Sequence, residues 1–429
     1  MKGTNTAPFA LSPITQHYVL TRSTPLRNLL VPLSILFFSC AVPANANPTA
    51  ESDTTEKAAQ LARQFLIIDT HIDLPGLLLT EWRDVSGKSA ATEFDYVRAK
   101  EGGLDVPFMS IYVPSDLEGT GKAKPRAEAM IALVRRMVST WPDKFDLVAS
   151  THEVERKRGS GKILLAMGME NGSPIEGDLK NVEYFHRLGI SYITLAHAKW
   201  NHLADGSYDS TRHWNGLSPF GVKVVKEMNR VGIMVDISHL TDSAAFQVLR
   251  ISGAPVIASH SACRFFTPGF ERNMNDELIK ALAAKRGVLQ INFGSDFLDN
   301  RVRLASESGR KAIDKHIGDE HLDPDGKEAT AYERQYWKEH PRPFATVAQV
   351  AAHIDHVVKL VGVDYVGFGS DFDGVGDSLP IGLKDVSRYP NLIAELLRLG
   401  YGETDIEKIC GGNLLRVWSE VEQAATSGK

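Results

Sequence analysis

Eight short apolar stretches, separated by segments of helical spacing, constrain the fold of this chain more than any other feature. Most of them are continuous rather than alternating, which is typical of parallel strands covered on both faces. They are Phe65–Thr70, Val106–Val113, Ile163–Met169, Tyr192–Ala196, Ile233–Ser238, Val256–Ser259, Val288–Phe293 and Tyr365–Gly369. Strand and helix alternating eight times predict an α/β fold, specifically a (β/α)₈ TIM barrel.

Several of the intervening segments carry recognisable helix ends. Pro219–Val231 has apolar residues at helical spacing and stops at Gly232, a residue suited to a helix C-cap. The other helices predicted in this way are Asp242–Ile251, Asn275–Arg286 and Val347–Leu360. These boundaries support the alternation on which the barrel prediction depends.

Side chains of the kinds that bind metals follow six of the eight predicted strands. In a TIM barrel the carboxyl ends of the strands surround the mouth where active sites form. A single His or Glu at a strand end is more often structural, but several at matching ends indicate a common site. The residues are Asp69, His71 and Asp73 at the end of the first strand and just after it, then Glu170, His197, His239, His260 and Asp371.

The spacing of these residues predicts a binuclear metal site at the carboxyl ends of the strands. His71 and Asp73 are two residues apart, so both side chains can face one divalent cation. His239 and His260 could hold a second cation, and the carboxylate of Glu170 could bridge the two. Nitrogen and oxygen ligands favour zinc, with other transition metals as alternatives. We therefore expect two Zn²⁺ ions bridged by Glu170 and a water or hydroxide, a centre suited to amide hydrolysis.

The residues around the eighth strand end suggest the proton-transfer group. Asp371 follows two small residues, Gly369 and Ser370, and is the candidate general base. Asp373 fits a turn or capping carboxylate better. His197 is not needed as a ligand, so we assign it to stabilising the developing oxyanion.

Taken together, these motifs resemble those of the membrane dipeptidase family, within the metal-dependent amidohydrolases. The matching stretches run from Asp69 to Asp73, Gly168 to Gly172, Tyr192 to His197, Asp236 to His239, Ser259 to Ser261, Arg272 to Asn273, Gly369 to Gly374, Asn391 to Leu397 and Gly412 to Val417. The resemblance implies two zinc ions held by His71, Asp73, Glu170, His239 and His260. It also implies that His197 contacts the scissile carbonyl, Arg272 holds the substrate carboxylate and Asp371 transfers the proton.

Two features depart from the family pattern. The family usually has Tyr after the Asn-Phe pair that ends the seventh strand, whereas here Gly294 follows Asn292-Phe293. The missing side chain predicts a larger space beside the substrate carboxylate. The segment 299–345, with 19 charged residues out of 47, is a long insertion. We expect a solvated surface insertion there, with a lid over the barrel mouth as the alternative.

The leading functional hypothesis is a zinc-dependent dipeptidase acting on small dipeptides, including those with a D-configured C-terminal residue. One alternative keeps the barrel and the metals but hydrolyses another cyclic amide, a lactone or a beta-lactam. A non-enzymatic alternative is a metal-stabilised periplasmic binding protein. The net charge of −5 argues against a nucleic-acid partner, and a homodimer is an open alternative to a monomer.

The first residues predict export. Arg22 and Arg27 precede an apolar run of ten residues, and Ala44-Asn45-Ala46 fits a signal-peptidase site. Ten residues are too few to span a bilayer, and no second apolar run follows. We therefore expect a signal peptide at 1–46 and a single catalytic domain at 47–429, periplasmic or secreted. A lipoprotein acylated at Cys40 is the minor alternative.

Cys263 and Cys410 remain after cleavage of the predicted signal peptide. Export would allow the two thiols to pair, because disulfides persist outside the cytosol. Their separation along the chain does not say whether they are close in space. The alternative is two buried free thiols that act as small apolar groups.

Overall fold

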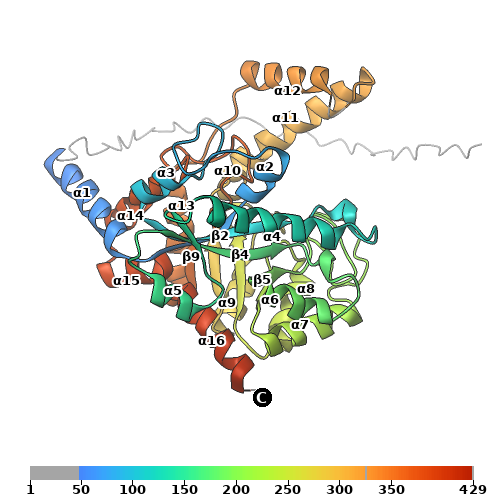
Figure 1. Ribbon diagram of the computed structural model, residues 1–429. Coiled ribbons are helices and arrows are strands. Elements are labelled where there is room, and N and C mark those ends of the chain that lie inside the picture. Colours follow the sequence, from blue (N-terminus) through green and yellow to red (C-terminus); the bar gives the residue numbers. More distant parts are fainter. Residues whose placement is uncertain (1–47, 324–325, 428–429) are drawn as a thin grey trace, which may run out of the picture. The chain divides into compact units, whose positions relative to one another are not determined.

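Eight parallel strands close into a barrel in the computed structural model, which describes residues 48–323 and 326–427 (Figure 1). Neighbouring strands pair in the order β2-β1-β9-β8-β7-β6-β5-β4, and pairing of β2 with β4 closes the ring. The strands are β1 (Ile67–Ile72), β2 (Leu104–Tyr112), β4 (Ile163–Glu170), β5 (Ile190–Thr194), β6 (Met234–Asp236), β7 (Val256–Ser261), β8 (Val288–Ile291) and β9 (Val366–Phe368). Each predicted apolar stretch overlaps one of them, so the TIM barrel prediction is confirmed.

One strand was not predicted. β3 (Phe145–Leu147) pairs in parallel with Ile163–Leu165, the first part of β4. The second part of β4, Ala166–Glu170, pairs with β2 instead. β3 therefore lies outside the closed ring, and three residues are too few to give a recognisable apolar run.

The four predicted helices are present, and their ends lie within two residues of the predicted ones. In α7 (Pro219–Val231) the Ser218 side chain accepts a hydrogen bond from the Gly221 amide, and Gly232 closes the helix with φ 91°. The remaining three are α8 (Asp242–Ile251), α9 (Asp276–Ala284) and α13 (Val347–Val361). Further helices are α1 (Pro48–Gln64), α2 (Leu74–Thr80), α3 (Tyr96–Gly102), α4 (Ala123–Thr140), α5 (Thr151–Lys157), α6 (Lys180–Arg187), α14 (Tyr389–Arg398), α15 (Glu403–Glu407) and α16 (Asn413–Ser427).

Apolar side chains fill the barrel interior and its amino-terminal end. Phe108 of β2 packs between Tyr192 of β5 and Trp418 of α16, with ring centroids 5.7 Å and 5.2 Å away. All three side chains are fully buried or nearly so, and α16 adds Val417 and Val421 to the same cluster. The interior is thus a packed core rather than a channel, and the opposite, carboxyl-terminal end is left for chemistry.

The 299–345 segment is largely helical, which the sequence did not predict. After α10 (Ser295–Leu298), α11 (Asn300–Asp319) and α12 (Lys327–Glu339) pack against each other (Figure 1). Gly309 of α11 allows this contact, because a Cβ there would come within 2.1 Å of the Trp337 ring. Few apolar residues are buried in this pair, so the charge-rich composition obscured the helical spacing.

No helix within the described part of the chain is long and apolar enough to cross a membrane. Cys263 and Cys410 are both buried and free, which agrees with the alternative of two apolar thiols rather than a disulfide. The predicted signal peptide, its cleavage site at Ala46 and Cys40 lie outside the described residues.

Candidate metal centre

The five predicted metal ligands meet at the carboxyl ends of the barrel strands. His71 and Glu170 lie at the ends of β1 and β4, His260 lies in β7, Asp73 precedes α2, and His239 follows β6. One oxygen of Glu170, Oε2, is 3.4 Å from His71 Nε2, which is itself 3.4 Å from Asp73 Oδ2. The other oxygen, Oε1, is 3.1 Å from His239 Nε2 and 3.3 Å from His260 Nε2. Glu170 therefore presents one oxygen to each predicted ligand pair.

The electrostatics keep Glu170, His239 and His260 in the states that bind cations. Burial alone would raise the pKa of Glu170, but its contacts with the surrounding imidazoles, His71 first and then His197, hold it well below its usual range. Burial, with nearby positive charge, also holds the pKa values of His239 and His260 well below theirs. Glu170 is thus an anion, and these two imidazoles are neutral with a lone pair to offer.

The arrangement leaves a buried ring nitrogen without a hydrogen bond to a described residue. His71 Nε2 is buried and accepts or donates no hydrogen bond among the described residues. The potential ligand atoms of His71, Glu170 and His260 lie within 4.8 Å of one another. The same holds for those of His71, Asp73 and Asp371. An orphaned imidazole nitrogen among carboxylate oxygens fits a divalent cation, and this donor set suits zinc.

His197 and Asp371 lie against the same cluster. His197 Nε2 is 3.4 Å from Glu170 Oε1, and burial lowers the pKa of His197, so its ring is neutral. Asp371 accepts a hydrogen bond of 2.7 Å from Asn292 Nδ2. Burial, followed by the negative charge of Asp73, raises the pKa of Asp371 to about 7. A carboxyl group of this kind is suited to taking up and releasing a proton.

Several residues of the site have backbone conformations that favour glycine. His239 has φ 66° and Asp371 has φ 65°, and Asn171, directly after Glu170, has φ 81°. Such left-handed positions are uncommon in non-glycine residues and gather at functional sites. Asp373, with φ 64°, instead accepts hydrogen bonds from the amides of Glu93 and Phe94, which supports its prediction as a capping carboxylate.

A cavity of about 400 Å³ opens over these residues. Its lining includes Asp73, Glu170, His197, His239 and Asp371, together with the aromatic side chains of Tyr112, Tyr208 and Phe297. The three aromatic residues were not predicted from the sequence. Tyr112 ends β2, one of the two strands that no metal-ligand type of residue follows. Its position at a strand end could have identified it from the sequence. Tyr208 and Phe297 lie in connections that carry no recognisable motif.

Known proteins share this sequence pattern across nearly the whole described chain. The family model described as membrane dipeptidase (peptidase family M19) matches residues 55–429. The chain belongs to the membrane dipeptidase family. Dipeptidase tcpJ of Claviceps purpurea is 33% identical over 349 residues, covering 80% of this chain and 72% of that protein. Dipeptidase 3 of Rattus norvegicus is 32% identical over 380 residues, covering 86% and 67% respectively.

Solved structures of the family share the fold. The probable dipeptidase PvdM of Pseudomonas aeruginosa aligns with a TM-score of 0.76 and 26% identity, over 87% of this chain and all of that one. A metallo peptidase of Rhodobacter sphaeroides, liganded with a phosphinate mimic of the dipeptide L-Ala-D-Ala, aligns with a TM-score of 0.67 and 26% identity, over 83% and 99%. This family member is therefore a metallopeptidase of the dipeptidase class. The prediction of an enzyme is confirmed, which sets aside the binding-protein alternative.

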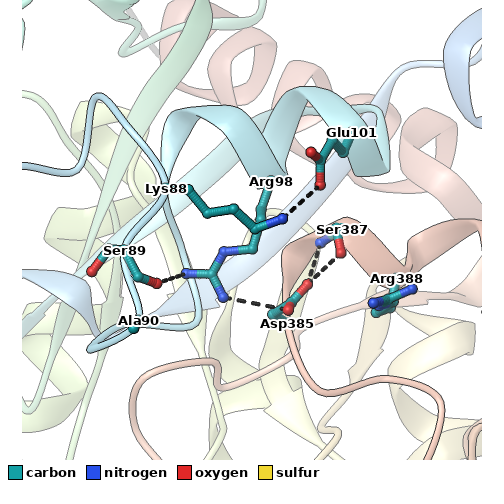
Figure 2. A pocket seen from close by; sticks show the side chains of 8 residues that line it. All are labelled: Lys88, Ser89, Ala90, Arg98, Glu101, Asp385, Ser387 and Arg388. Carbon is teal, nitrogen blue, oxygen red and sulfur yellow. Dashed lines mark hydrogen bonds and ion pairs between the residues drawn. The ribbon is translucent and has the colours of Figure 1, made fainter.

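The loop between α2 and α3 supports the segment that follows β9. Arg98 in α3 pairs with Asp95 at 2.6 Å. It also donates to the Ser89 carbonyl at 2.8 Å and reaches Asp385 at 3.3 Å (Figure 2). A cavity of about 570 Å³ lies beside these groups, but the Arg98 guanidinium is already committed to its partners. The loop so held carries Glu93, whose amide donates to Asp373, two residues after Asp371.

Arg272, which the family resemblance assigns to the substrate carboxylate, lies close to the cavity but is only 3% exposed. It donates to Ser261 Oγ and to the His260 carbonyl, both at 2.7 Å, and its Nη2 is 3.0 Å from His239 Nε2. The guanidinium carbon stands 5.2 Å from the ring centroid of Phe297. Arg272 thus contacts His239 and Phe297, which line the cavity, but does not line the cavity itself.

Gly294 does not leave the enlarged space that the sequence predicted. A Cβ at this position would lie 2.9 Å from the ring of Phe297 and 3.1 Å from Asn292 Oδ1. The Phe297 ring therefore occupies the region next to Gly294. That ring comes from α10, a helix that the sequence did not predict.

Proposed function

We propose that this family member hydrolyses the peptide bond of small dipeptides with two Zn²⁺ ions. His71 and Asp73 would hold one ion, His239 and His260 the other, and Glu170 would bridge them. The observation that carries the proposal is the placement of Glu170, whose two oxygens face different imidazoles at 3.1–3.4 Å. A buried carboxylate that divides its oxygens in this way suits two cations better than one.

The side chains around the centre supply the remaining chemistry. Divalent cations in such a pair polarise the scissile carbonyl and lower the pKa of the attacking water. Asp371 accepts the proton of that water and returns it to the departing amine, and the hydrogen bond from Asn292 orients its carboxylate. His197, held near Glu170, donates a hydrogen bond to the oxygen on which negative charge develops.

The family resemblance suggests how a dipeptide is selected. A free carboxylate one residue beyond the scissile bond would pair with Arg272, whose planar fork can make two charged hydrogen bonds. The related Rhodobacter metallo peptidase is liganded with a mimic of L-Ala-D-Ala. We include dipeptides with a D-configured C-terminal residue among the substrates on this ground.

Substrate profiling of the purified protein tests this function. With Zn²⁺ added, we expect hydrolysis of L,L or L,D dipeptides, loss of activity after chelation and recovery when metal is returned. Tripeptides and N-acetylated dipeptides serve as matched negative substrates. Faster turnover of lactones or beta-lactams than of any dipeptide would favour the alternative substrate class.

Replacement of Arg272 by Ala should weaken binding of dipeptides. We expect KM to rise by a factor corresponding to about 1.5–3 kcal/mol, the value of a hydrogen bond to a charged group. Dipeptide amides lack the carboxylate, so their KM should change much less. If acid and amide substrates suffer equally, Arg272 is not the carboxylate clamp, and its contacts with His239 and His260 become its main role.

Export should produce a mature chain that begins at Asn47. The predicted signal peptide ends with Ala44-Asn45-Ala46, and cleavage follows the last of these residues. N-terminal sequencing of the exported protein measures this directly. An acylated Cys40 at the terminus would instead show a lipoprotein.

A further inference from the structure

Two imidazoles of the metal centre have their outward nitrogen against a buried hydroxyl group. His71 Nδ1 is 2.8 Å from the Tyr192 hydroxyl, which also lies 2.9 Å from the Thr70 carbonyl oxygen. His260 Nδ1 is 2.7 Å from Ser259 Oγ, which also lies 2.6 Å from Asp236 Oδ2. In both cases the hydroxyl stands between a ring nitrogen and an oxygen acceptor.

Proton counting fixes the direction of the first hydrogen-bond chain. The Thr70 carbonyl can only accept, so the single hydroxyl proton of Tyr192 points at it. The Tyr192 oxygen must then accept from His71, and Nδ1 must carry a proton. Were the hydroxyl to donate to Nδ1, two oxygen acceptors would face each other at 2.9 Å inside the core.

The second chain has the same direction. Asp236 is fully buried and accepts from the amides of Ser238 and Ser259 at 3.0 Å and 2.8 Å, and from two hydroxyls, those of Thr194 and Ser259. A carboxylate can only accept hydrogen bonds, so the Ser259 hydroxyl donates to Asp236. Ser259 Oγ then accepts from His260, whose Nδ1 carries the proton.

We propose that Tyr192 and Ser259 are positioning residues that hold His71 and His260 with a proton on Nδ1, so that Nε2 is kept for a divalent cation. This inference rests on the proposed metal centre and adds to it the groups that set the tautomer of two ligands. Hydrogen bonds to the far nitrogen of a ligating imidazole fix its orientation and raise its affinity for the metal.

The barrel is built to let Tyr192 reach His71. Tyr192 is opposite Gly168 in the pairing of β4 with β5, and a Cβ on Gly168 would come within 1.9 Å of the Tyr192 ring. The ring therefore passes over the backbone of β4, against Phe108, toward β1. Gly168 is thus required for this chain of contacts, which accounts for a glycine two residues before Glu170.

The other two imidazoles of the site lack such a partner. Nδ1 of His239 and Nδ1 of His197 are buried without a hydrogen bond to any described residue. The proposal therefore distinguishes two histidines whose Nδ1 is held by a hydroxyl group from two whose Nδ1 has no hydrogen bond to a described residue. This difference gives the experiment an internal comparison.

Metal affinity of variants provides the first test. Tyr192→Phe and Ser259→Ala should each bind Zn²⁺ about 10–100-fold more weakly than the wild type in competition with a chromophoric chelator. Tyr401→Phe and Ser252→Ala are matched controls, because each loses a hydroxyl hydrogen bond, to Asp355 and to the Ala254 carbonyl, away from the ligands. A loss below fivefold in both variants, or an equal loss in the controls, would overturn the proposal.

Nitrogen-15 spectra of the histidine rings in the wild-type protein provide a second test that does not require the variants to fold. We expect Nδ1 of His71 and of His260 to be protonated with and without Zn²⁺, with signals assigned through the two variants or by selective labelling. An unprotonated Nδ1 in either ring contradicts the inference. Failure to bind Zn²⁺ at all would instead count against the metal centre, since the tautomers are measured independently in the metal-free protein.

Discussion

Replacing Glu170 by Gln should remove bound metal and activity together. The side-chain amide of the variant carries no negative charge, and only one of its two terminal atoms can act as a ligand. Its NH₂ group would face either His71 Nε2 or the pair His239 and His260, where a ligand oxygen stood before. Mutation of a residue that hydrogen-bonds to a metal ligand lowers metal affinity or activity by up to about 100-fold. Loss of the bridging ligand itself should therefore lower metal affinity by more than about 100-fold.

Metal analysis beside steady-state kinetics measures this effect. Glu422→Gln is a suitable control, because that carboxylate on α16 binds Thr151, which begins α5, rather than a predicted ligand. The control should keep both its metal content and its turnover. Two full equivalents of metal in the Glu170→Gln protein, together with normal turnover, would exclude the bridging role.

The barrel and the position of its site were predictable from the sequence for a physical reason. Parallel strands covered by helices read as continuous apolar runs, and the residue after each run is placed at the mouth by the geometry of the fold. His71, Glu170, His239 and His260 each follow such a run, and the structure brings them together. A chain position at a strand end is therefore enough to predict proximity across the barrel.

Positions inside the runs and in the connections were not predictable in this way. Tyr192 lies within an apolar stretch, and nothing in that pattern indicates that its hydroxyl reaches His71 on another strand. The Phe297 ring of α10 lies beside Gly294 and against Arg272, an arrangement that depends on tertiary packing. The α11 and α12 pair was missed because its charges suggested a solvated segment.

Replacing Asp371 by Asn should have the opposite signature, with metal retained and turnover lost. Asn has nearly the same shape, and its side-chain oxygen can still accept the hydrogen bond from Asn292. A neutral amide cannot take a proton from the attacking water, so kcat should fall by on the order of 10²–10⁴, the contribution of a positioned acid or base. Metal content measured on the same samples should stay at the wild-type level.

The metal measurement distinguishes two roles that the geometry allows for this carboxylate. The ligand atoms of Asp371, His71 and Asp73 lie within 4.8 Å of one another, so Asp371 is also close enough to serve as a ligand. Loss of metal in the Asp371→Asn protein would assign it that role. Asp373→Asn is the matched comparison, because Asp373 accepts hydrogen bonds from the amides of Glu93 and Phe94. This replacement should lower stability more than turnover. If Asp373→Asn abolishes turnover while Asp371→Asn does not, the proton transfer belongs to Asp373.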